Sequence, residues 1–188
     1  MDTVTKLNPH VVIIATGSKP FTPSIPGIEK PHVVSAEDVL KRKARVGKKV
    51  VVAGGGEVGV ETADFIAENN YAESVTVIEM LPTLASDMPA MPRTYLLQVI
   101  VPKWGIKTYT DMKIQEITDK EVIALDKNWK TYRFEADTIV NAMGYLPNST
   151  LEESLRGKIP EVYSIGDCVK PRNLLHAIHE AAYIARQI

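Results

Sequence analysis

The sequence predicts an α/β fold: a Rossmann-like parallel sheet with an antiparallel three-stranded meander attached. Two apolar runs, Val50 to Ala53 and Ser74 to Ile78, are separated by a glycine-rich turn and a helical pattern. Such runs are typical of strands buried on both faces of a parallel sheet. Three strand-like segments then follow closely, at residues 113–118, 121–125 and 130–135, and their short polar turns favour a meander. We expect the parallel strands at about 50–53, 75–78, 106–108 and 138–142.

The N-terminal part contains a short strand and a proline-rich connector. Residues 9–20 have a buried-type strand that ends at the small residues 15–17, and four prolines make residues 21–32 extended. Ser35, with Asp38 three residues later, predicts the start of a short helix that ends near Arg42. This helix leads into the strand at 50–53.

The turn after that strand has the pattern G-x-G-x-x-G, read from Gly54, Gly55, Gly56, Glu57, Val58 and Gly59. Gly54 permits a tight turn, and Gly56 lets the backbone approach a pyrophosphate. Gly59 lets the following helix pack closely on the strand, while free N–H groups at the helix start face the phosphate charge. Because a strand precedes this pattern and a helix follows it, the turn predicts a dinucleotide site.

A carboxylate completes the predicted site at the end of the second strand. Glu79 lies about 20 residues after Gly59, where an acid accepts hydrogen bonds from an adenosine ribose. A 2′-phosphate beside Glu79 would be repelled, and no Arg follows it, so the sequence favours NADH over NADPH. Met80, the next residue, is included among the expected cofactor contacts. Glu61 is a further candidate at the nicotinamide end, although carboxylates also favour helix N-termini for dipole reasons alone.

The helix from Glu57 to about Asn69 carries acidic residues at helical spacing, which indicates a solvated face or, alternatively, a docking surface. Asp87 is expected to cap a helix from about residue 88 to Lys103, kinked or frayed near Pro92 and Pro102. Toward the C-terminus, residues 162–165 predict a strand that runs into Gly166 and Asp167. A helix is expected from about Arg172.

Composition excludes several classes of function. The 188 residues carry 22 Lys and Arg against 23 Asp and Glu, a net charge of −1 that gives no sign of a nucleic-acid partner. The longest apolar runs are far shorter than a membrane span, and we expect a soluble, cytoplasmic protein without a membrane partner. The single Cys168 excludes an internal disulfide, and we expect it to be a small buried side chain. His176 and His179 lack a third ligand, so no metal site is predicted.

Four stretches taken together resemble a known superfamily. They are the turn Gly54 to Glu61, Ala15-Thr16-Gly17 with Pro20, Ala142-Met143-Gly144 with Pro147-Asn148, and residues 162–167. This set resembles the two-dinucleotide-binding-domain flavoproteins, the pyridine nucleotide-disulfide oxidoreductase superfamily. Residues 171–180 after Gly166-Asp167-Cys168 look like the C-terminal region of NADH:flavin oxidoreductases related to old yellow enzyme. Examples of these are 2-enoate reductase, dienoyl-CoA reductase and NADH oxidase-like proteins.

The resemblance implies an NAD(H)-binding domain inserted into an FAD-binding domain. It implies a partial FAD-domain edge and linker at 1–46, the NAD(H)-binding domain at 47–144, and a returning FAD-domain segment at 145–188. Asp167 matches the aspartate that bonds the ribityl chain of FAD, and Gly144 and the stretch around Gly17 match the crossings between domains. The family's FAD domain opens with its own G-x-G-x-x-G unit, which this sequence lacks. We therefore expect an incomplete FAD site and an excerpt of a longer protein, with the flavin and barrel domains of the parent as partners.

In the full-length protein the resemblance implies hydride transfer from NADH to FAD. Electrons would then pass through an iron–sulfur cluster and FMN to an α,β-unsaturated substrate. The chain alone is expected to bind NADH without turnover and to supply no catalytic residue. The alternatives are a module of an NADH-dependent disulfide or ferredoxin reductase, or a non-catalytic nucleotide-binding domain.

Overall fold

The computed structural model describes residues 2–188, which form two compact units. One unit is Thr22–Gly144, and the other combines the N-terminal residues up to Phe21 with Tyr145–Ile188. The chain therefore passes between the units after Phe21 and again after Gly144. Each unit is described by itself below.

The unit Thr22–Gly144 is built on a parallel sheet of five strands in the order β3-β10-β4-β5-β6. These strands are β3 (Val33–Ser35), β4 (Lys49–Ala53), β5 (Ser74–Ile78), β6 (Lys107–Tyr109) and β10 (Thr138–Asn141). The predicted parallel sheet is confirmed, and its four predicted strands all occur within a residue or two of their expected bounds. Strand β3 was not predicted. It pairs with β10, with Val34 opposite Val140.

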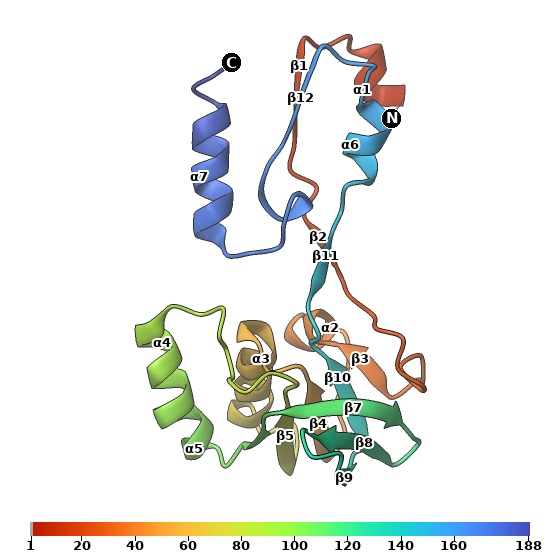
Figure 1. Ribbon diagram of the computed structural model, residues 1–188, viewed down its shortest axis with the longest axis vertical. Helices are drawn as coiled ribbons and strands as arrows, with labels where there is room; N and C mark the ends of the chain where they lie inside the picture. Colours follow the sequence, from red (N-terminus) through yellow and green to blue (C-terminus); the bar gives the residue numbers. More distant parts are fainter. Residues whose placement is uncertain (1) are drawn as a thin grey trace. The chain divides into compact units, whose positions relative to one another are not determined.

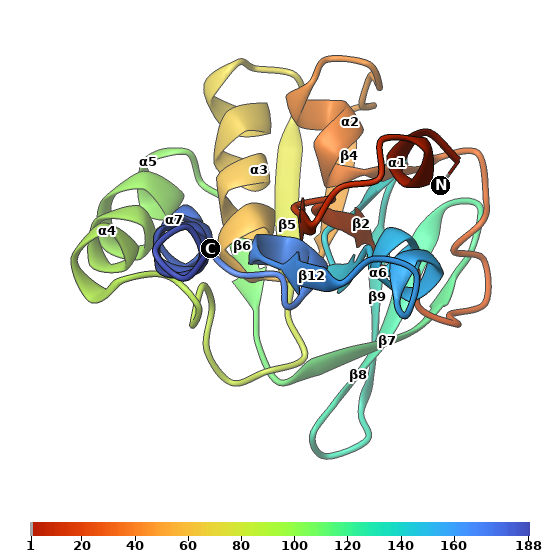
Figure 2. The same ribbon diagram turned by 90° about the horizontal axis from the view of Figure 1, so that it is seen from above.

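Residues Val50 to Ala53 of the central strand β4 are buried on both faces of the sheet, which explains why this run is apolar throughout. Val50 and Val52 belong to the core beneath the helices α2 (Ala36–Leu40) and α3 (Glu57–Glu68). Val51 and Ala53 belong to a second core on the other face of the sheet. Figure 1 shows the two helices on one face of the sheet, and Figure 2 shows them side by side over β4. The buried run thus fixes the strand between two layers.

The second layer is the predicted antiparallel meander. Its strands are β7 (Met112–Ile117), β8 (Glu121–Asp126) and β9 (Thr131–Glu135), paired in that order. Ile114, Ile117 and Val122 point from it into the second core, together with Ile78 of β5. The meander therefore closes the face of the sheet that the helices leave open (Figure 1).

A continuous helical segment flanks α3 at residues 90–103, but its central turn is not α-helical. It consists of α4 (Ala90–Tyr95), the π-helix η1 (Leu96–Ile100) and α5 (Val101–Lys103). Val101 N donates to Leu96 O, a bond five residues back along the chain. Pro102 has no N–H to donate within the ladder, and a widened turn just before it accommodates that gap. The expected kink is thus a π turn.

The smaller unit has two short strand pairs and a small core. Strand β1 (Val11–Ile14) pairs in parallel with β12 (Glu161–Ser164), and β2 (Ser18–Pro20) pairs antiparallel with β11 (Tyr145–Pro147). Its helices are α1 (Asp2–Lys6), α6 (Thr150–Leu155), the 3-10 turn η2 (Gly166–Cys168) and α7 (Leu174–Ile184). Ile14, Leu155, Ile159 and Cys168 form the buried core.

The predicted boundary at residue 46 falls inside the larger unit. Ser35 caps α2 as predicted, because its Oγ accepts a hydrogen bond from Asp38 N at 3.0 Å. The buried side chains of α2, Ala36 and Val39, lie in the same core as Val50 and Val52 of β4. Strand β3 and helix α2 are therefore part of the sheet unit, and only residues up to Phe21 group with the C-terminal segment.

Candidate nucleotide site

The glycine turn lies between the end of β4 and the start of α3, and three of its glycines are required by the fold itself. A Cβ on Gly59 would lie 2.0 Å from Gly54 O, and one on Gly54, whose φ is +103°, would lie 2.4 Å from Ala142 O. A Cβ on Gly55 would lie 2.8 Å from Glu79 Cβ, next to the backbone of the loop after β5, and 2.4 Å from Leu84 Cδ2. Any side chain at these positions would push apart the strand, the helix and the loop after β5.

Gly56 differs from the other glycines of the turn. Its backbone is ordinary, with φ −66° and ψ −177°, and a Cβ there would have its nearest neighbour, Asp87 Oδ2, at 3.5 Å. That distance is a normal van der Waals contact, so the fold has room for a larger residue. The space beside Gly56 is at the N-terminus of α3, where backbone N–H groups attract an anion.

Glu79 lies against the same turn, directly after β5. Its Oε2 accepts a hydrogen bond from Gly55 N at 2.6 Å, and its Oε1 accepts one from Leu81 N at 2.7 Å. Each carboxylate oxygen keeps a second lone pair for a further donor. The structure thus brings the predicted acid to the glycine turn and fixes its orientation from two sides.

The start of α3 is strongly acidic. Partial burial raises the pKa of Glu61, and the neighbouring carboxylates of Glu57, Asp64 and Asp87 raise it further. Val58 packs at the edge of the helix-side core, and its carbonyl oxygen accepts a hydrogen bond from Thr62 Oγ1 at 2.6 Å. Glu57 and Glu61 lie in the first turns of α3, and Val58 packs against the helix-side core.

Asp87 does not have the role that the sequence predicted. The residue before α4 is Pro89, which makes no side-chain cap, and Asp87 Oδ1 instead accepts a hydrogen bond from Glu57 N at 3.0 Å. Asp87 thus caps α3, thirty residues back along the chain. Sequence patterns at a helix start are local, and no local signal connects Asp87 with Glu57.

Two remaining predicted contacts, Met80 and Gly144, follow residues that border the turn, Glu79 and Met143. Met80 follows Glu79 and is 62% exposed. Gly144 is the last residue of the larger unit, has a φ of +102°, and would have no atom of the described residues within 4 Å of a Cβ. Its left-handed backbone favours glycine at the crossing. This preference belongs to the crossing and gives no evidence of a nucleotide contact.

Asp167 lies in the smaller unit at the turn η2. Its Oδ2 accepts a hydrogen bond from Ser18 Oγ at 3.3 Å, and its Oδ1 accepts one from Arg172 N at 3.1 Å. A hollow of about 380 Å³ beside it is lined by residues of the same unit, among them Gly17, Asn173 and Ala177. Asp167 and the start of α7 thus border one cavity.

Glu180 is a residue of this cavity region that sequence analysis missed. Its Oε2 accepts a hydrogen bond from Gly166 N at 2.7 Å, and its Oε1 pairs with Arg172. The bond from Gly166 lowers the pKa of Glu180, and the Arg172 guanidinium lowers it further. Nothing in the spacing of Gly166, Arg172 and Glu180 predicts that one carboxylate holds both partners.

Cys168 is buried as predicted, and its Sγ lies 3.3 Å from Ile14 O.

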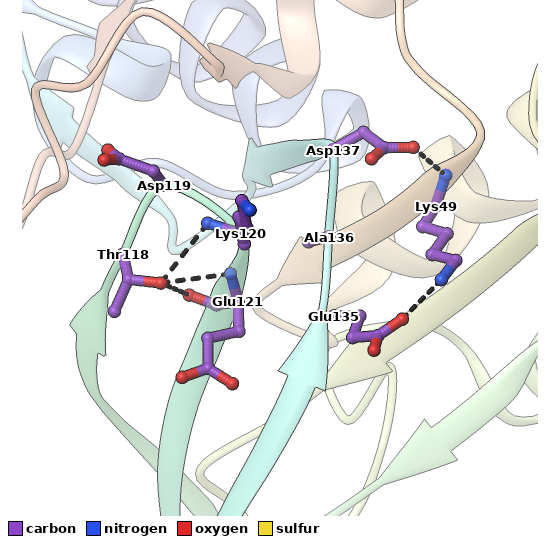
Figure 3. A pocket seen from close by; sticks show the side chains of 8 residues that line it. All are labelled: Lys49, Thr118, Asp119, Lys120, Glu121, Glu135, Ala136 and Asp137. Carbon is purple, nitrogen blue, oxygen red and sulfur yellow. Dashed lines mark hydrogen bonds and ion pairs between the residues drawn. The ribbon is translucent and has the colours of Figure 1, made fainter.

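A broader hollow of about 810 Å³ lies at the opposite end of β4, between the β7–β8 turn and the start of β10 (Figure 3). Its polar groups stabilise the local chain. Lys49 Nζ pairs with Glu135, Asp137 Oδ2 accepts a hydrogen bond from Lys49 N at 2.9 Å, and Thr118 Oγ1 accepts one from Glu121 N at 3.1 Å. This hollow is an internally paired groove, and it is not continuous with the glycine turn at the other end of β4.

Comparison with known proteins decides the family. A family profile described as pyridine nucleotide-disulphide oxidoreductase matches residues 2–182. The chain belongs to this family. The predicted superfamily is thereby confirmed, and the chain is a domain of the flavin-dependent NAD(H) oxidoreductase type, a family that implies NAD(H) and FAD binding.

Relatives within this family agree with the predicted subgroup. The chain is 38% identical to an NADH oxidase of Thermoanaerobacter brockii, over 100% of this chain and 29% of the relative. It is 36% identical to a cinnamate reductase of Clostridium sporogenes, over 94% of this chain and 26% of the relative. The solved structure of a 2-naphthoyl-CoA reductase, bound to 2-naphthoyl-CoA, matches with a TM-score of 0.90 and 34% identity, over 100% of this chain and 28% of that chain. The chain thus spans less than a third of the length of these oxidoreductases.

Among residues 2–188, no helix has the length and apolar character needed to cross a membrane.

Proposed function

We propose that the chain is the NADH-binding module of a flavin-dependent oxidoreductase, which passes hydride from NADH to FAD for eventual reduction of an α,β-unsaturated substrate. The observation that carries the nucleotide part is the space beside Gly56. The fold requires glycine at positions 54, 55 and 59 but not at 56. A pyrophosphate bound at the start of α3 would explain the glycine at position 56, because its oxygens must come close to the backbone N–H groups there.

The residues around the glycine turn fit NADH. Backbone N–H groups at the start of α3 would hold the pyrophosphate, and the free lone pairs of Glu79 would accept hydrogen bonds from the adenosine ribose hydroxyls. Glu61 would lie toward the nicotinamide end. Bound there, NADH would supply a hydride to a flavin held elsewhere.

Glu79 also supports NADH over NADPH. Hydrogen bonds from Gly55 N and Leu81 N hold its carboxylate in one place, so it cannot swing away from a 2′-phosphate without breaking them. Two like charges about 5 Å apart repel each other by roughly 1–3 kcal/mol at the effective dielectric constants of a protein surface. No Arg occurs between Met80 and Met91, and the next one, Arg93, donates from its Nε to the carbonyl oxygen of Leu84.

The residues of the smaller unit fit part of an FAD site. Asp167, held by Ser18 and Arg172 N, would bond the ribityl chain, and the cavity beside it would take part of the flavin. The family's other glycine-rich unit, for the ADP half of FAD, is absent from this sequence. We therefore propose that FAD binds fully only when the rest of the flavin domain is present.

The substrate class rests on the relatives. A cinnamate reductase and a 2-naphthoyl-CoA reductase are both named for conjugated acids or their thioesters. An iron–sulfur cluster would belong to a partner domain, because this chain has a single, buried cysteine. FMN and the barrel domain that completes the reduction would also belong to the rest of the parent protein. Cytoplasmic location is part of the same proposal.

A paired titration tests the proposal. The purified chain is titrated with NADH and, in parallel, with NADPH, and nucleotide fluorescence and the visible spectrum are recorded. We expect saturable binding that prefers NADH, in a protein without flavin colour. Binding of neither nucleotide would contradict the NADH site, and a yellow protein would contradict the incomplete FAD site.

A further inference from the structure

Asp87 occupies the position that the proposed function gives to the pyrophosphate. Its Oδ1 accepts the hydrogen bond from Glu57 N, 3.0 Å away, at the first residue of α3. The same carboxylate is the nearest group to the space beside Gly56, with Oδ2 3.5 Å from the place of a Cβ. The occupied N–H group and the one glycine of the turn that has room for a Cβ thus lie at the same place.

The segment that carries Asp87 is anchored on the glycine turn. Ala85 N donates to Gly55 O at 2.7 Å, and Leu84 and Ala85 are buried in the helix-side core. Arg93 Nε holds Leu84 O at 2.8 Å. The backbone beside Asp87 is therefore fixed, while the Asp87 side chain itself is exposed and can turn into water.

We infer that Asp87 is a positioning residue of the nucleotide site whose carboxylate competes with the pyrophosphate for the N-terminus of α3. This inference rests on the proposed NADH site. In the nucleotide-free chain the carboxylate accepts a hydrogen bond from the N–H of Glu57, and its negative charge stabilises α3 through the positive end of the helix dipole. On binding, the dianionic pyrophosphate takes that N–H, and Asp87 turns out to solvent, since two anions at one helix terminus repel each other. Asp87 therefore keeps the turn ordered without ligand and lowers the affinity for it.

The test compares Asp87→Asn with the wild-type chain. Asn keeps an oxygen that accepts from Glu57 N but has no charge. We expect D87N to bind NADH and ADP-ribose about fivefold more tightly, the effect of removing one unit charge in a solvated site. Adenosine, which has no phosphate, should bind both proteins equally. The difference should shrink at about 0.5 M salt, because screening weakens the repulsion between exposed charges.

Two further variants make the test specific. Asp87→Ser provides a second neutral cap if D87N folds poorly, and unfolding curves of both variants show whether the helix is intact. Glu68→Gln removes a charge of the same sign from the last turn of α3 and should leave NADH affinity unchanged.

Each outcome decides between the two proposals. Equal or weaker NADH binding by folded D87N, or an equal gain for adenosine, would overturn the role of Asp87 and leave the NADH site standing. Absence of NADH binding by all the variants and the wild type would overturn both.

Discussion

Replacing Gly56 by Ala should separate binding from folding. Gly56 has a φ of −66°, which an L-residue can adopt, and the Cβ of the new Ala would lie 3.5 Å from Asp87 Oδ2. Ala restricts the unfolded chain and thereby stabilises by about 0.4–1 kcal/mol. Ala is also a poorer N-cap than Gly, and this costs a similar amount. The free energy of unfolding should therefore change by less than about 1 kcal/mol.

The same methyl group should weaken NADH binding strongly. It would fill the space at the start of α3 that the proposed pyrophosphate uses, and overfilling a close-packed contact costs about 1–3 kcal/mol. That range corresponds to a dissociation constant roughly 5- to 150-fold higher. Fluorescence titration with NADH measures the binding, and urea denaturation measures the stability of the same sample.

Gly59→Ala is the matched control. Its Cβ would lie 2.0 Å from Gly54 O, so α3 would have to move off the strand. We expect a loss of about 3 kcal/mol or more, a large fraction of the roughly 5–15 kcal/mol that typically stabilises a domain. A G56A variant that binds NADH like the wild type would refute the role given to the space beside Gly56, and a G56A variant as unstable as G59A would refute the geometry of the turn.

Three other substitutions test separate features. Glu79→Gln leaves only one good acceptor for two backbone donors, so urea denaturation should show a loss of about 1–3 kcal/mol, and the preference for NADH over NADPH should fall about tenfold. An unchanged preference would contradict the role of the charge. Burial and neighbouring carboxylates raise the pKa of Glu61 above its ordinary 4.5, so Glu61 holds its proton more firmly in the folded chain than in the unfolded chain. The contribution of Glu61 to stability should then fall as the pH rises above 4.5, and unfolding curves of Glu61→Gln should lack that contribution when they are compared with the wild type over the same pH values. Val52→Ala, at a fully buried position of β4, should lower the free energy of unfolding by about 2 kcal/mol, and a loss below about 0.5 kcal/mol would show that the site repacks.

The sequence predicted the elements whose signals are local. Residues 50–53 are apolar without interruption, and Val75, Val77 and Ile78 of β5 are apolar and buried, because the sheet is covered on both faces. Strand β3 has only three residues, Val33–Ser35, and it exists because Val34 lies opposite Val140 of β10. Pairing over such a separation leaves no periodicity in either segment, so β3 was not predicted.

In the candidate site, too, residues with a local sequence signal were predicted, and residues that depend on distant contacts were not. Glu79 could be predicted because the end of β5 must lie beside the end of β4, its neighbour in the sheet. Asp87 and Glu180 could not, because each bonds a backbone N–H of a distant turn, Glu57 N and Gly166 N. A carboxylate in a loop is compatible with many partners, and only the fold selects one.

Most of the glycine pattern is explained by packing and is therefore weak evidence for a bound nucleotide. A Cβ on Gly54 or Gly59 would meet backbone atoms, and a Cβ on Gly55 would lie 2.8 Å from Glu79 Cβ, so a domain that had lost its nucleotide would still need glycine at all three positions. Even Glu79 has a structural task, since it holds Gly55 N and Leu81 N. Gly56 is the glycine of the turn that the fold does not require. The distinction between a nucleotide-binding module and a domain that merely retains the pattern therefore depends on this one position, and a larger residue there would be compatible with the fold but not with a bound pyrophosphate.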